Sequence, residues 1–376
     1  MIKLSLPHLA GKEKEYVDQA IDSTWIVPLG PWVDEFEHRL EKFLDAPNVV
    51  ALSAGTAAIH LGLVMAGVKP GDEVVCQDLT FSASCNPIKY LGAHPVFVDS
   101  ESKSWNMDPE LLEKAIEERH AATGRYPAAI IPVHLYGMPA DMKRIMAIAD
   151  RYGIPVVEDA AEALGSTYHA KFCGTFGKYG ALSFNGNKII TTSGGGALVC
   201  PDKESADRVK FLSTQARENR PYYYHTTIGY NYRLSNVSAA IGCAQAEELA
   251  WRVERRRAIH ALYQQLLGGY EAINVHDEPT EASKSNFWLT TILLNTDKTN
   301  ITPDELRIAL LERDIETRLI WRPMHMQPVF EDCPFYGNGT GEEIFARGLC
   351  LPSGSSLTDE DVKTVAKAIL DIVGKH

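Results

Sequence analysis

Cysteine is scarce in this chain, and the spacing of its few cysteines excludes two classes of small domain. The 376 residues include seven cysteines, and no two of them stand at CxxC spacing. Zinc ribbons need closely spaced cysteine pairs, and disulfide scaffolds need a dense, even set. The sequence therefore predicts neither class, and we expect no metal site.

Long apolar segments are also missing. The sequence has no run of 18 apolar residues, and residues 1–16 lack the apolar stretch of a secretory signal. A membrane-spanning helix needs roughly 20 such residues, and a signal peptide needs about 7–15. We therefore expect a cytoplasmic protein that does not span a membrane.

Positive charge is in short supply, with 37 basic against 49 acidic residues and a net charge of −12. Proteins that follow a phosphate backbone or dock on anionic membranes need the opposite balance, so we expect neither partner. A dinucleotide fingerprint is absent as well, because Gly194–Gly196 matches neither GxGxxG nor a P-loop, which argues against an NAD-dependent sugar epimerase. A phosphorylated small ligand in a local pocket remains compatible with an acidic chain.

Short apolar runs that alternate with helical patterns fill the first two thirds of the chain. Strands that are apolar throughout and separated by helices are typical of an α/β fold with a mainly parallel sheet covered on both faces. After Leu234 the pattern changes, and a helix expected over 236–267 leads to a strand over 287–294 and to a helix opened by Thr302. We expect a large domain over 1–250 and a smaller C-terminal α/β domain over 251–376, with ligands at the carboxyl ends of the large-domain strands.

Two candidate site segments follow predicted strands. Ser53-Ala54-Gly55-Thr56 stands between a strand and a helix, where free backbone N–H groups and the helix dipole favour a phosphate. An ordinary N-cap and tight turn is the alternative. Asp159 and Glu162 follow another buried strand and are candidates for a pocket above the sheet edge. Acidic residues that merely decorate a helix N-terminus are the alternative there.

Two further segments carry polar residues in unusual places. Lys188 is the only charged residue between Tyr179 and Asp202, in a stretch that otherwise has the composition of buried sheet. Buried lysines are rare and often react as amines, whereas a turn lysine that reaches solvent is the bland alternative. Asn231 and Arg233 lie in Gly229-Tyr-Asn-Tyr-Arg-Leu234 before a long helix, where a solvated loop is an equally simple interpretation.

Taken together and in this order, the four segments resemble the DegT/DnrJ/EryC1/StrS sugar aminotransferases, which are fold-type-I enzymes dependent on pyridoxal 5'-phosphate. The resemblance implies that Lys188 carries the cofactor as a Schiff base and that Asp159 pairs with its pyridine nitrogen. It also implies that Gly55, Thr56 and Ser183 contact the cofactor phosphate. Pyridoxamine phosphate is then the expected intermediate form of the cofactor.

The resemblance extends over nearly the whole chain, from the loop at 25–31 to the segment at 322–328. It implies that Phe81 stacks on the cofactor ring and that Asn231 reaches the phosphate bound by a neighbouring subunit, so a homodimer with shared active sites is expected. Glu162 is a further candidate cofactor or sugar contact. Aromatic and charged residues are candidate contacts to the nucleotide-sugar, diphosphate or amino donor, namely Trp25, Arg233, Trp321 and His325.

Within the family, the run from Ser183 to Gly196 most resembles the branch that aminates C4 of a UDP-linked 4-keto-6-deoxy-N-acetylhexosamine on the way to bacillosamine-type glycans, with L-glutamate as the amino donor. A GDP- or dTDP-linked 4-keto or 3-keto sugar is the alternative substrate. A sugar 3-dehydratase is a further alternative, although relatives of that kind carry histidine at the position of Lys188. A non-catalytic regulator that binds the cofactor is the alternative from another class.

Overall fold

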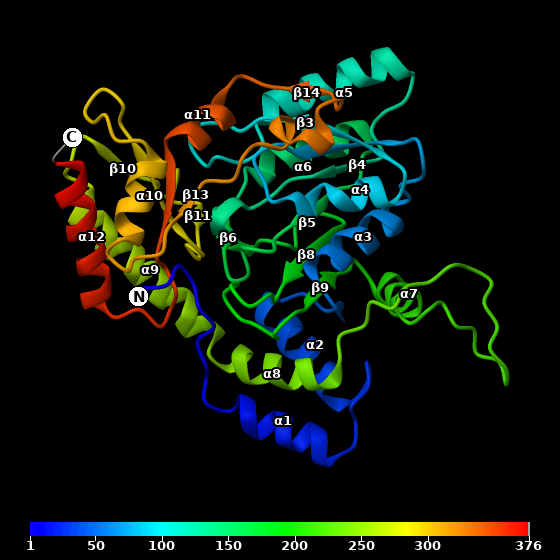
Figure 1. The fold of residues 1–376 in the computed structure, drawn as a ribbon. Coiled ribbons are helices and arrows are strands. Elements are labelled where there is room, and N and C mark those ends of the chain that lie inside the picture. The colour runs from blue at the N-terminus through cyan, green and yellow to red at the C-terminus, as the bar shows by residue number, and fades with distance from the viewer. Residues whose placement is uncertain (375–376) are drawn as a thin grey trace.

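The computed structural model describes residues 1–374, which form a large α/β domain and a smaller one packed against it (Figure 1). Within those residues, the structure contains no helix that is long and apolar enough to cross a membrane. The large domain is built from helices α1 (Glu13–Asp22), α2 (Pro31–Leu44), α3 (Gly55–Ala66), α4 (Asn86–Tyr90), α5 (Pro109–Thr123), α6 (Met142–Tyr152), α7 (Lys203–Ser213) and α8 (Asn236–Glu247).

The central sheet runs through the whole large domain. Strands β14, β3, β2 and β4 pair in parallel, and the parallel bridges Ile130–Val156 and Val133–Asp159 join β4 to the strands β5, β8, β9 and β1. Only β9 is antiparallel to both of its neighbours, so the expected mainly parallel sheet is confirmed. The strands are β1 (Val49–Leu52), β2 (Glu73–Gln77), β3 (His94–Val98), β4 (Ala129–Ile131), β5 (Val157–Asp159), β8 (Tyr179–Ser183), β9 (Gly196–Val199) and β14 (Phe335–Tyr336).

Helices cover both faces of this sheet. Apolar side chains of α3 pack on one face, and those of α5 and α6 pack on the other. Such burial on both sides explains why the strands have no alternating polar residues. The remaining short elements of the large domain are η1 (Ser82–Ser84), η2 (Leu135–Gly137), β6 (Thr167–Tyr168) and β7 (Lys171–Phe172), and β11 (Ser283–Lys284) pairs with β6.

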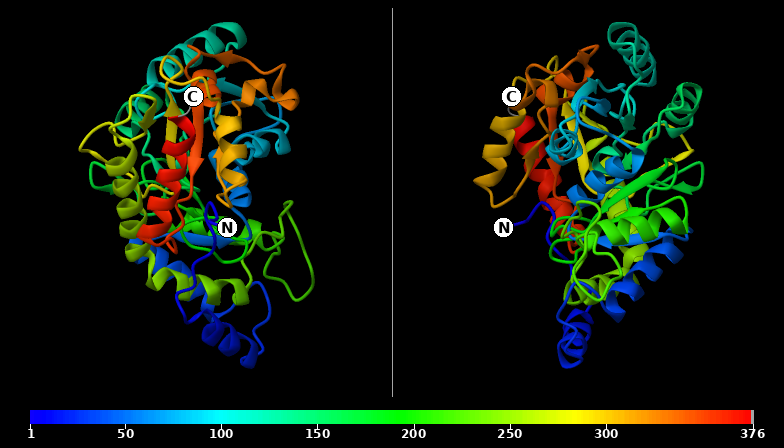
Figure 2. Two further views of the ribbon diagram at one scale, coloured as in Figure 1. Left: turned by 60° about the vertical axis from the view of Figure 1, so that its left-hand side comes forward. Right: turned by 90° about the vertical axis from the view of Figure 1, so that its right-hand side faces the viewer.

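The small domain is an antiparallel sheet with helices packed against it (Figure 2). Its strands follow the order β10 (Ile273–Val275), β12 (Thr290–Leu294), β15 (Gly348–Leu351) and β13 (Arg318–Leu319). The other elements are α9 (Leu249–Leu267), α10 (Pro303–Leu311), η3 (Met324–Met326), η4 (Pro328–Phe330), α11 (Thr340–Arg347) and α12 (Asp359–Val373).

Two expected elements of this region differ in detail. The helix expected over 236–267 is broken at Glu248 into α8 and α9. The strand expected from residue 287 begins at Thr290, because Phe287 has a φ of 44°, which an extended strand does not allow. The capping box at Thr302 and Glu305 is present as the sequence predicts.

The division at residue 250 remains a prediction, and the chain departs from it in two segments. Residues 324–336 return to the large domain, where Phe330 joins its core and β14 pairs with β3. The N-terminal segment instead lies on the small domain, because Ile2 forms backbone hydrogen bonds with Asp314 and Glu316. Local sequence patterns cannot show such long-range crossings, since each crossing segment is too short to have a period of its own.

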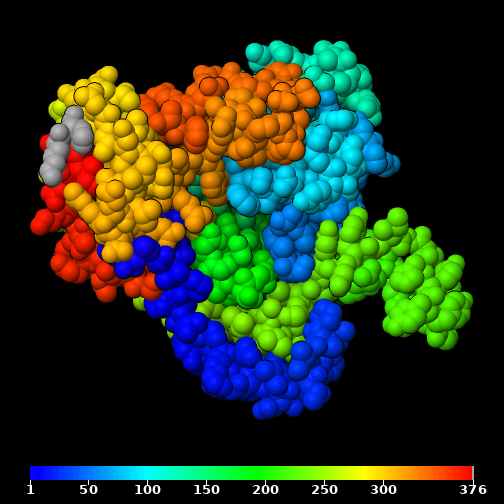
Figure 3. All heavy atoms as spheres, in the orientation of Figure 1, coloured from blue at the N-terminus to red at the C-terminus, as the bar shows by residue number. Residues whose placement is uncertain are grey.

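The segment between α7 and α8 projects from the body of the protein (Figures 1 and 3). Its exposed side chains include large apolar and aromatic ones: Tyr222 is 63% exposed, Tyr223 is 78% exposed and Ile228 is 84% exposed. We refer to residues 215–232 as the projecting arm. Large exposed apolar groups that lie together usually mark a contact surface.

Candidate active site

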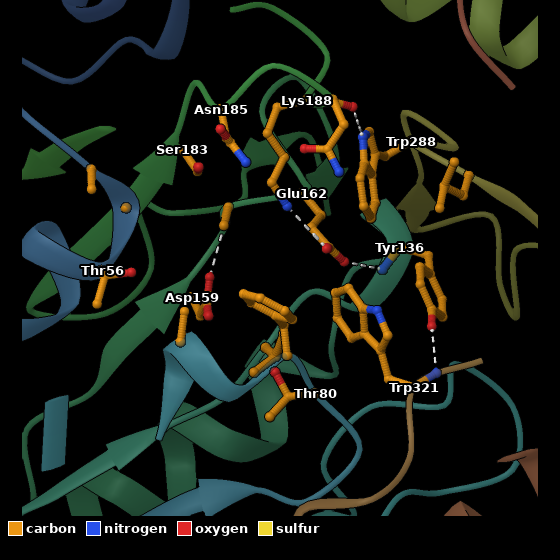
Figure 4. Close-up of a pocket in the computed structure, with 18 of the residues that line it drawn as sticks. Thr56, Thr80, Tyr136, Asp159, Glu162, Ser183, Asn185, Lys188, Trp288 and Trp321 are labelled. Carbon is orange, nitrogen blue, oxygen red and sulfur yellow. Dashed lines mark hydrogen bonds and ion pairs between the residues drawn. The ribbon is translucent and has the colours of Figure 1, made fainter. Parts of the chain in front are cut away.

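A cavity of about 440 Å³ lies where the carboxyl ends of β5 and β8 meet the turn between β1 and α3 (Figure 4). Residues of the small domain close its other side. The cavity brings together most of the residues predicted from the sequence, namely Gly55, Thr56, Phe81, Asp159, Glu162, Ser183, Lys188 and Trp321. This is the end of the sheet at which α/β proteins bind ligands.

The turn into α3 is shaped for an anion. A Cβ atom on Gly55 would lie 2.9 Å from Cβ of Ser183, and one on Gly196 would lie 2.5 Å from the backbone nitrogen of Gly55, so neither position has room for a side chain. The first turn of α3 holds no acidic residue and, within the described residues, no side-chain cap. Its N–H groups therefore face the cavity beside the hydroxyls of Thr56 and Ser183, an arrangement that suits a phosphate.

Asp159 ends β5 and is fixed from two sides. Its Oδ2 accepts a hydrogen bond of 2.6 Å from the Ser84 hydroxyl, and its Oδ1 accepts one of 3.1 Å from the backbone N–H of Ala161. The Ser84 hydroxyl is in turn 2.7 Å from that of Thr80. A turn follows β5 in place of a helix, so the alternative of acids at a helix N-terminus is wrong. The carboxylate is only 6% exposed and lines the cavity, where it can pair with a protonated ring nitrogen.

Lys188 lies in the turn after β8 and extends into the cavity (Figure 4). Its Nζ is 3.1 Å from Oε1 of Glu162, and the two side chains are 12% and 4% exposed, so the alternative of a lysine that reaches solvent is wrong. The other Glu162 oxygen accepts a hydrogen bond of 2.7 Å from the backbone N–H of Tyr136. Burial raises the pKa of Glu162 to about 7, although the Lys188 ammonium opposes this. The amine therefore faces a carboxyl group that can take or release a proton near neutral pH.

Aromatic rings form the side of the cavity nearest the small domain. Nζ of Lys188 lies 4.2 Å from the centroid of the Trp288 ring, whose Nε1–H donates a hydrogen bond of 2.7 Å to the backbone oxygen of Asn187. Trp321 lies 5.5 Å from Phe81 and 5.1 Å from Tyr136, measured between ring centroids. The Trp288 contact fixes both the backbone before Lys188 and the direction of its side chain.

Four predicted residues do not line this cavity. Arg233 lies beside β1, where its Nη1 is 2.6 Å from Glu37 and 2.9 Å from the backbone oxygen of Ala51, so its charge is already matched. Nδ1 of His325 is 2.7 Å from Asp78, and its ring stacks on Phe335. The structure therefore places both outside the wall of this cavity, and their expected contacts to a ligand stay predictions.

Trp25 and Asn231 also lie outside the cavity wall of their own chain. Trp25 is 42% exposed in the loop between α1 and α2. Asn231 is exposed at the base of the projecting arm, where it forms an isolated bridge with Thr214. For Asn231 this location agrees with its expected contact to a neighbouring subunit, which stays a prediction.

Sequence reasoning missed several residues of the site. Thr80 and Ser84 follow the carboxyl end of β2, and their position after a buried strand was a usable signal. Trp288 and Arg318 come from the small domain, and nothing in their local sequence pattern connects them with the large-domain residues of the cavity, which are far away in the chain. Only the folded chain brings them together.

The cavity contains what pyridoxal phosphate requires, namely an anion cradle, a buried carboxylate for the ring nitrogen and a lysine amine. Comparisons with known proteins agree. The profile of the DegT/DnrJ/EryC1/StrS aminotransferase family matches residues 7–370. EpsN of Bacillus subtilis, which is named as a pyridoxal phosphate-dependent aminotransferase, is 47% identical over 375 residues, or 99% of this chain and 95% of EpsN.

Two further comparisons extend this result. GDP-perosamine synthase of Escherichia coli O157:H7 is 38% identical over 96% of both chains. The crystal structure of a DegT DnrJ EryC1 StrS aminotransferase from Brucella abortus superposes with a TM-score of 0.90 at 30% identity, over 96% of this chain and 95% of that one. The fold is therefore fold-type I, the cofactor is pyridoxal phosphate, and this chain belongs to the DegT/DnrJ/EryC1/StrS aminotransferase family.

Proposed function

We propose that this enzyme moves the amino group of L-glutamate to C4 of a 4-keto-6-deoxy sugar linked to a nucleoside diphosphate. The observation that carries the proposal is the placement of Lys188 beside Glu162 and Asp159 in one cavity, next to a phosphate cradle, in a chain of the sugar aminotransferase family. Lysine at position 188 favours amino transfer over the dehydration expected of relatives with histidine there.

The roles of the residues follow from their positions. When bound, pyridoxal phosphate supplies an electron sink that acidifies the C–H bond next to an attached amino group. Gly55, Thr56 and Ser183 would hold its phosphate, and Asp159 would keep its ring nitrogen protonated. Nζ of Lys188 takes the proton from Cα of the donor in the first half-reaction and delivers one to C4 of the sugar in the second.

Glu162 and Trp288 support this proton transfer. The Glu162 carboxyl group, 3.1 Å from Nζ, can hold a proton while Lys188 is a free amine. The Trp288 ring beside Nζ excludes water from the same atom. Both residues keep Lys188 directed into the cavity between the steps.

The proposal includes two candidates for the nucleotide that carries the sugar. A UDP-linked 2-acetamido-2,6-dideoxy-4-hexulose is our first candidate, because the run from Ser183 to Gly196 most resembles that branch of the family. A GDP-linked sugar is the second candidate, supported by the 38% identity to a GDP-perosamine synthase. The two candidates share the keto group that receives nitrogen and differ in the base.

We further propose that the working unit is a homodimer with shared active sites. The projecting arm supports this, because Tyr223 and Ile228 expose apolar surface far from the body of their own subunit. Asn231 at the base of that arm is absent from the cavity wall of its own chain and is free to enter a neighbouring one.

The test is the visible spectrum of the cofactor-loaded protein during stepwise additions. L-Glutamate should bleach the absorbance band of bound pyridoxal phosphate with formation of 2-oxoglutarate, and the correct keto-sugar nucleotide should restore the band. UDP-, GDP- and dTDP-linked 4-keto-6-deoxy sugars are then compared at equal concentration. A band that glutamate leaves unchanged, or that none of the three sugars restores, would contradict the proposal.

A further inference from the structure

One of the charged side chains around the cavity has no role in the proposed chemistry. Within the described residues, its wall contains two carboxylates, Asp159 and Glu162, and two cations, Lys188 and Arg318. In the proposed function, Asp159 pairs with the ring nitrogen of the cofactor. Glu162 is paired with Lys188. Arg318 is therefore the cation of the wall to which the proposed chemistry has given no role.

Arg318 stands alone in an apolar surface. It belongs to β13, an edge strand of the small domain, where it is opposite Cys350 of β15. The other small-domain residues of the wall are apolar or aromatic, namely Trp288, Leu289, Leu319, Trp321 and Cys350. The other side chains of this wall therefore offer no charge that competes for an anionic ligand of the cavity.

The side chain of Arg318 is held only loosely. Its Nη2 lies 3.5 Å from Glu316, whose carboxylate is also 3.7 Å from Lys3. The Arg318 side chain is 64% exposed, so this ion pair is weak and easily exchanged. Arg318 also borders a hollow on the outer surface, which places it at the rim of the cavity.

We propose that Arg318 binds the α-carboxylate of the amino donor. The proposal rests on the amino transfer proposed above, because it concerns the donor in that same cavity. The α-carboxylate is one bond from the carbon that gives its proton to Lys188, so it must lie in the cavity as well. Arginine binds carboxylates with two parallel hydrogen bonds, which would fix the donor with its Cα–H toward Nζ.

Two other assignments compete with this one. Arg233, the sequence-based candidate for this role, is paired with Glu37 beside β1. A diphosphate is attached to C1 of the sugar, remote from the C4 that must reach Lys188, and it would leave the cavity past its rim. Binding of that diphosphate by Arg318 is therefore the alternative outcome of the test.

The test separates donor binding from turnover. The probe is α-methyl-L-glutamate, which has the α-carboxylate but no Cα–H to lose, titrated into the cofactor-loaded protein and followed by the visible spectrum and by calorimetry. Arg318→Gln should raise its Kd by about 10- to 100-fold, and Arg318→Lys should recover part of the loss. The binding of free UDP and GDP should stay within about twofold of wild type.

The matched control is Arg307→Gln, which removes another arginine from the same outer hollow but not from the cavity wall. It should leave the Kd of α-methyl-L-glutamate unchanged. Wild-type affinity of Arg318→Gln for the probe would overturn the proposal, as would weakened nucleotide binding alone, which would assign Arg318 to the diphosphate. A wild-type protein that forms no 2-oxoglutarate from glutamate would instead contradict the amino transfer itself, so the two failures are distinguishable.

Discussion

The two walls of the cavity differ in the chemistry of their side chains. The large-domain wall is polar and fixed: Asp159 is held by two hydrogen bonds, and Glu162 by a backbone N–H and by Lys188. The small-domain wall consists of rings and aliphatic groups with one loosely held cation, Arg318. Figure 4 shows this contrast, with Thr56 and Ser183 on one side and Trp288 and Trp321 on the other. Proton transfer needs fixed polar groups, whereas the choice of ligands needs a shaped surface, and the two domains divide these tasks.

The largest effect is expected from Lys188→Ala, which removes the reacting amine from the polar wall. We expect the formation of 2-oxoglutarate from glutamate to fall by at least about 10³-fold, since the variant loses the amine that takes the proton from Cα of the donor. Lys178→Ala, which changes an exposed lysine ten residues earlier, is the control and should keep wild-type activity. Substantial turnover by the Lys188→Ala protein would contradict the role of Lys188, and with it the proposal that the polar wall performs the proton transfer.

The next prediction tests whether a second subunit contributes Asn231 to the active site. Lys188→Ala and Asn231→Ala proteins should each be nearly inactive alone. Equal mixing with subunit exchange should restore about a quarter of wild-type activity, because half of the dimers are mixed and each mixed dimer has one intact site. The same mixture without exchange is the control. If activity does not recover after subunit exchange has been verified, the active site is formed by a single chain.

Asp159→Asn should reduce turnover by about 10²- to 10³-fold, since an amide does not hold a ring nitrogen protonated. Ser84→Ala should cost about tenfold or less, because Asp159 keeps its bond to the Ala161 N–H. Single-turnover kinetics with glutamate give both values. Equal losses in the two variants would mean that the polar wall depends on its hydroxyl support as much as on its carboxylate.

Trp288→Phe keeps an aromatic ring in the small-domain wall but removes the hydrogen bond to the Asn187 backbone oxygen. One lost hydrogen bond of about 1 kcal/mol corresponds to a drop of roughly fivefold in kcat, with little change in the KM for the sugar. Trp321→Phe removes no equivalent bond to the Lys188 turn and should affect mainly the KM for the sugar. The opposite split would reverse the roles given to these two tryptophans.

The last prediction concerns the stability of the cofactor-free protein and not its turnover. The folded pKa of Glu162, about 7, lies above its ordinary value of 4.5, so its contribution to stability is complete below pH 4.5 and is lost as the pH rises through 7. Glu162→Gln should abolish this loss, which is on the order of 1–3 kcal/mol. Denaturant unfolding between about pH 5 and about pH 8 measures it. Identical pH dependence in the two proteins would show that Glu162 titrates normally.

The same contrast between walls explains what the sequence could and could not predict. Gly55, Asp159 and Ser183 each end or follow a buried strand, so periodicity and the rule for parallel sheets place them at one edge. Lys188 became specific only through the resemblance, because local composition allowed a solvent-facing turn. Trp288 and Arg318 depend on the docking of the small domain. The pairing of Arg233 with Glu37 joins residues 196 positions apart, so local patterns could not predict it either.

The N-terminal segment is connected by hydrogen bonds to the turn that precedes the reacting lysine. Ile2 hydrogen-bonds to the small domain, and the Ser5 hydroxyl donates a hydrogen bond of 3.0 Å to the same Asn187 backbone oxygen that Trp288 contacts. The Ser5 hydroxyl also accepts one of 3.0 Å from the buried guanidinium of Arg256 on α9. These contacts connect the small domain, through the N-terminal segment, to the turn that precedes Lys188, so the position of the amine depends on the position of the small domain.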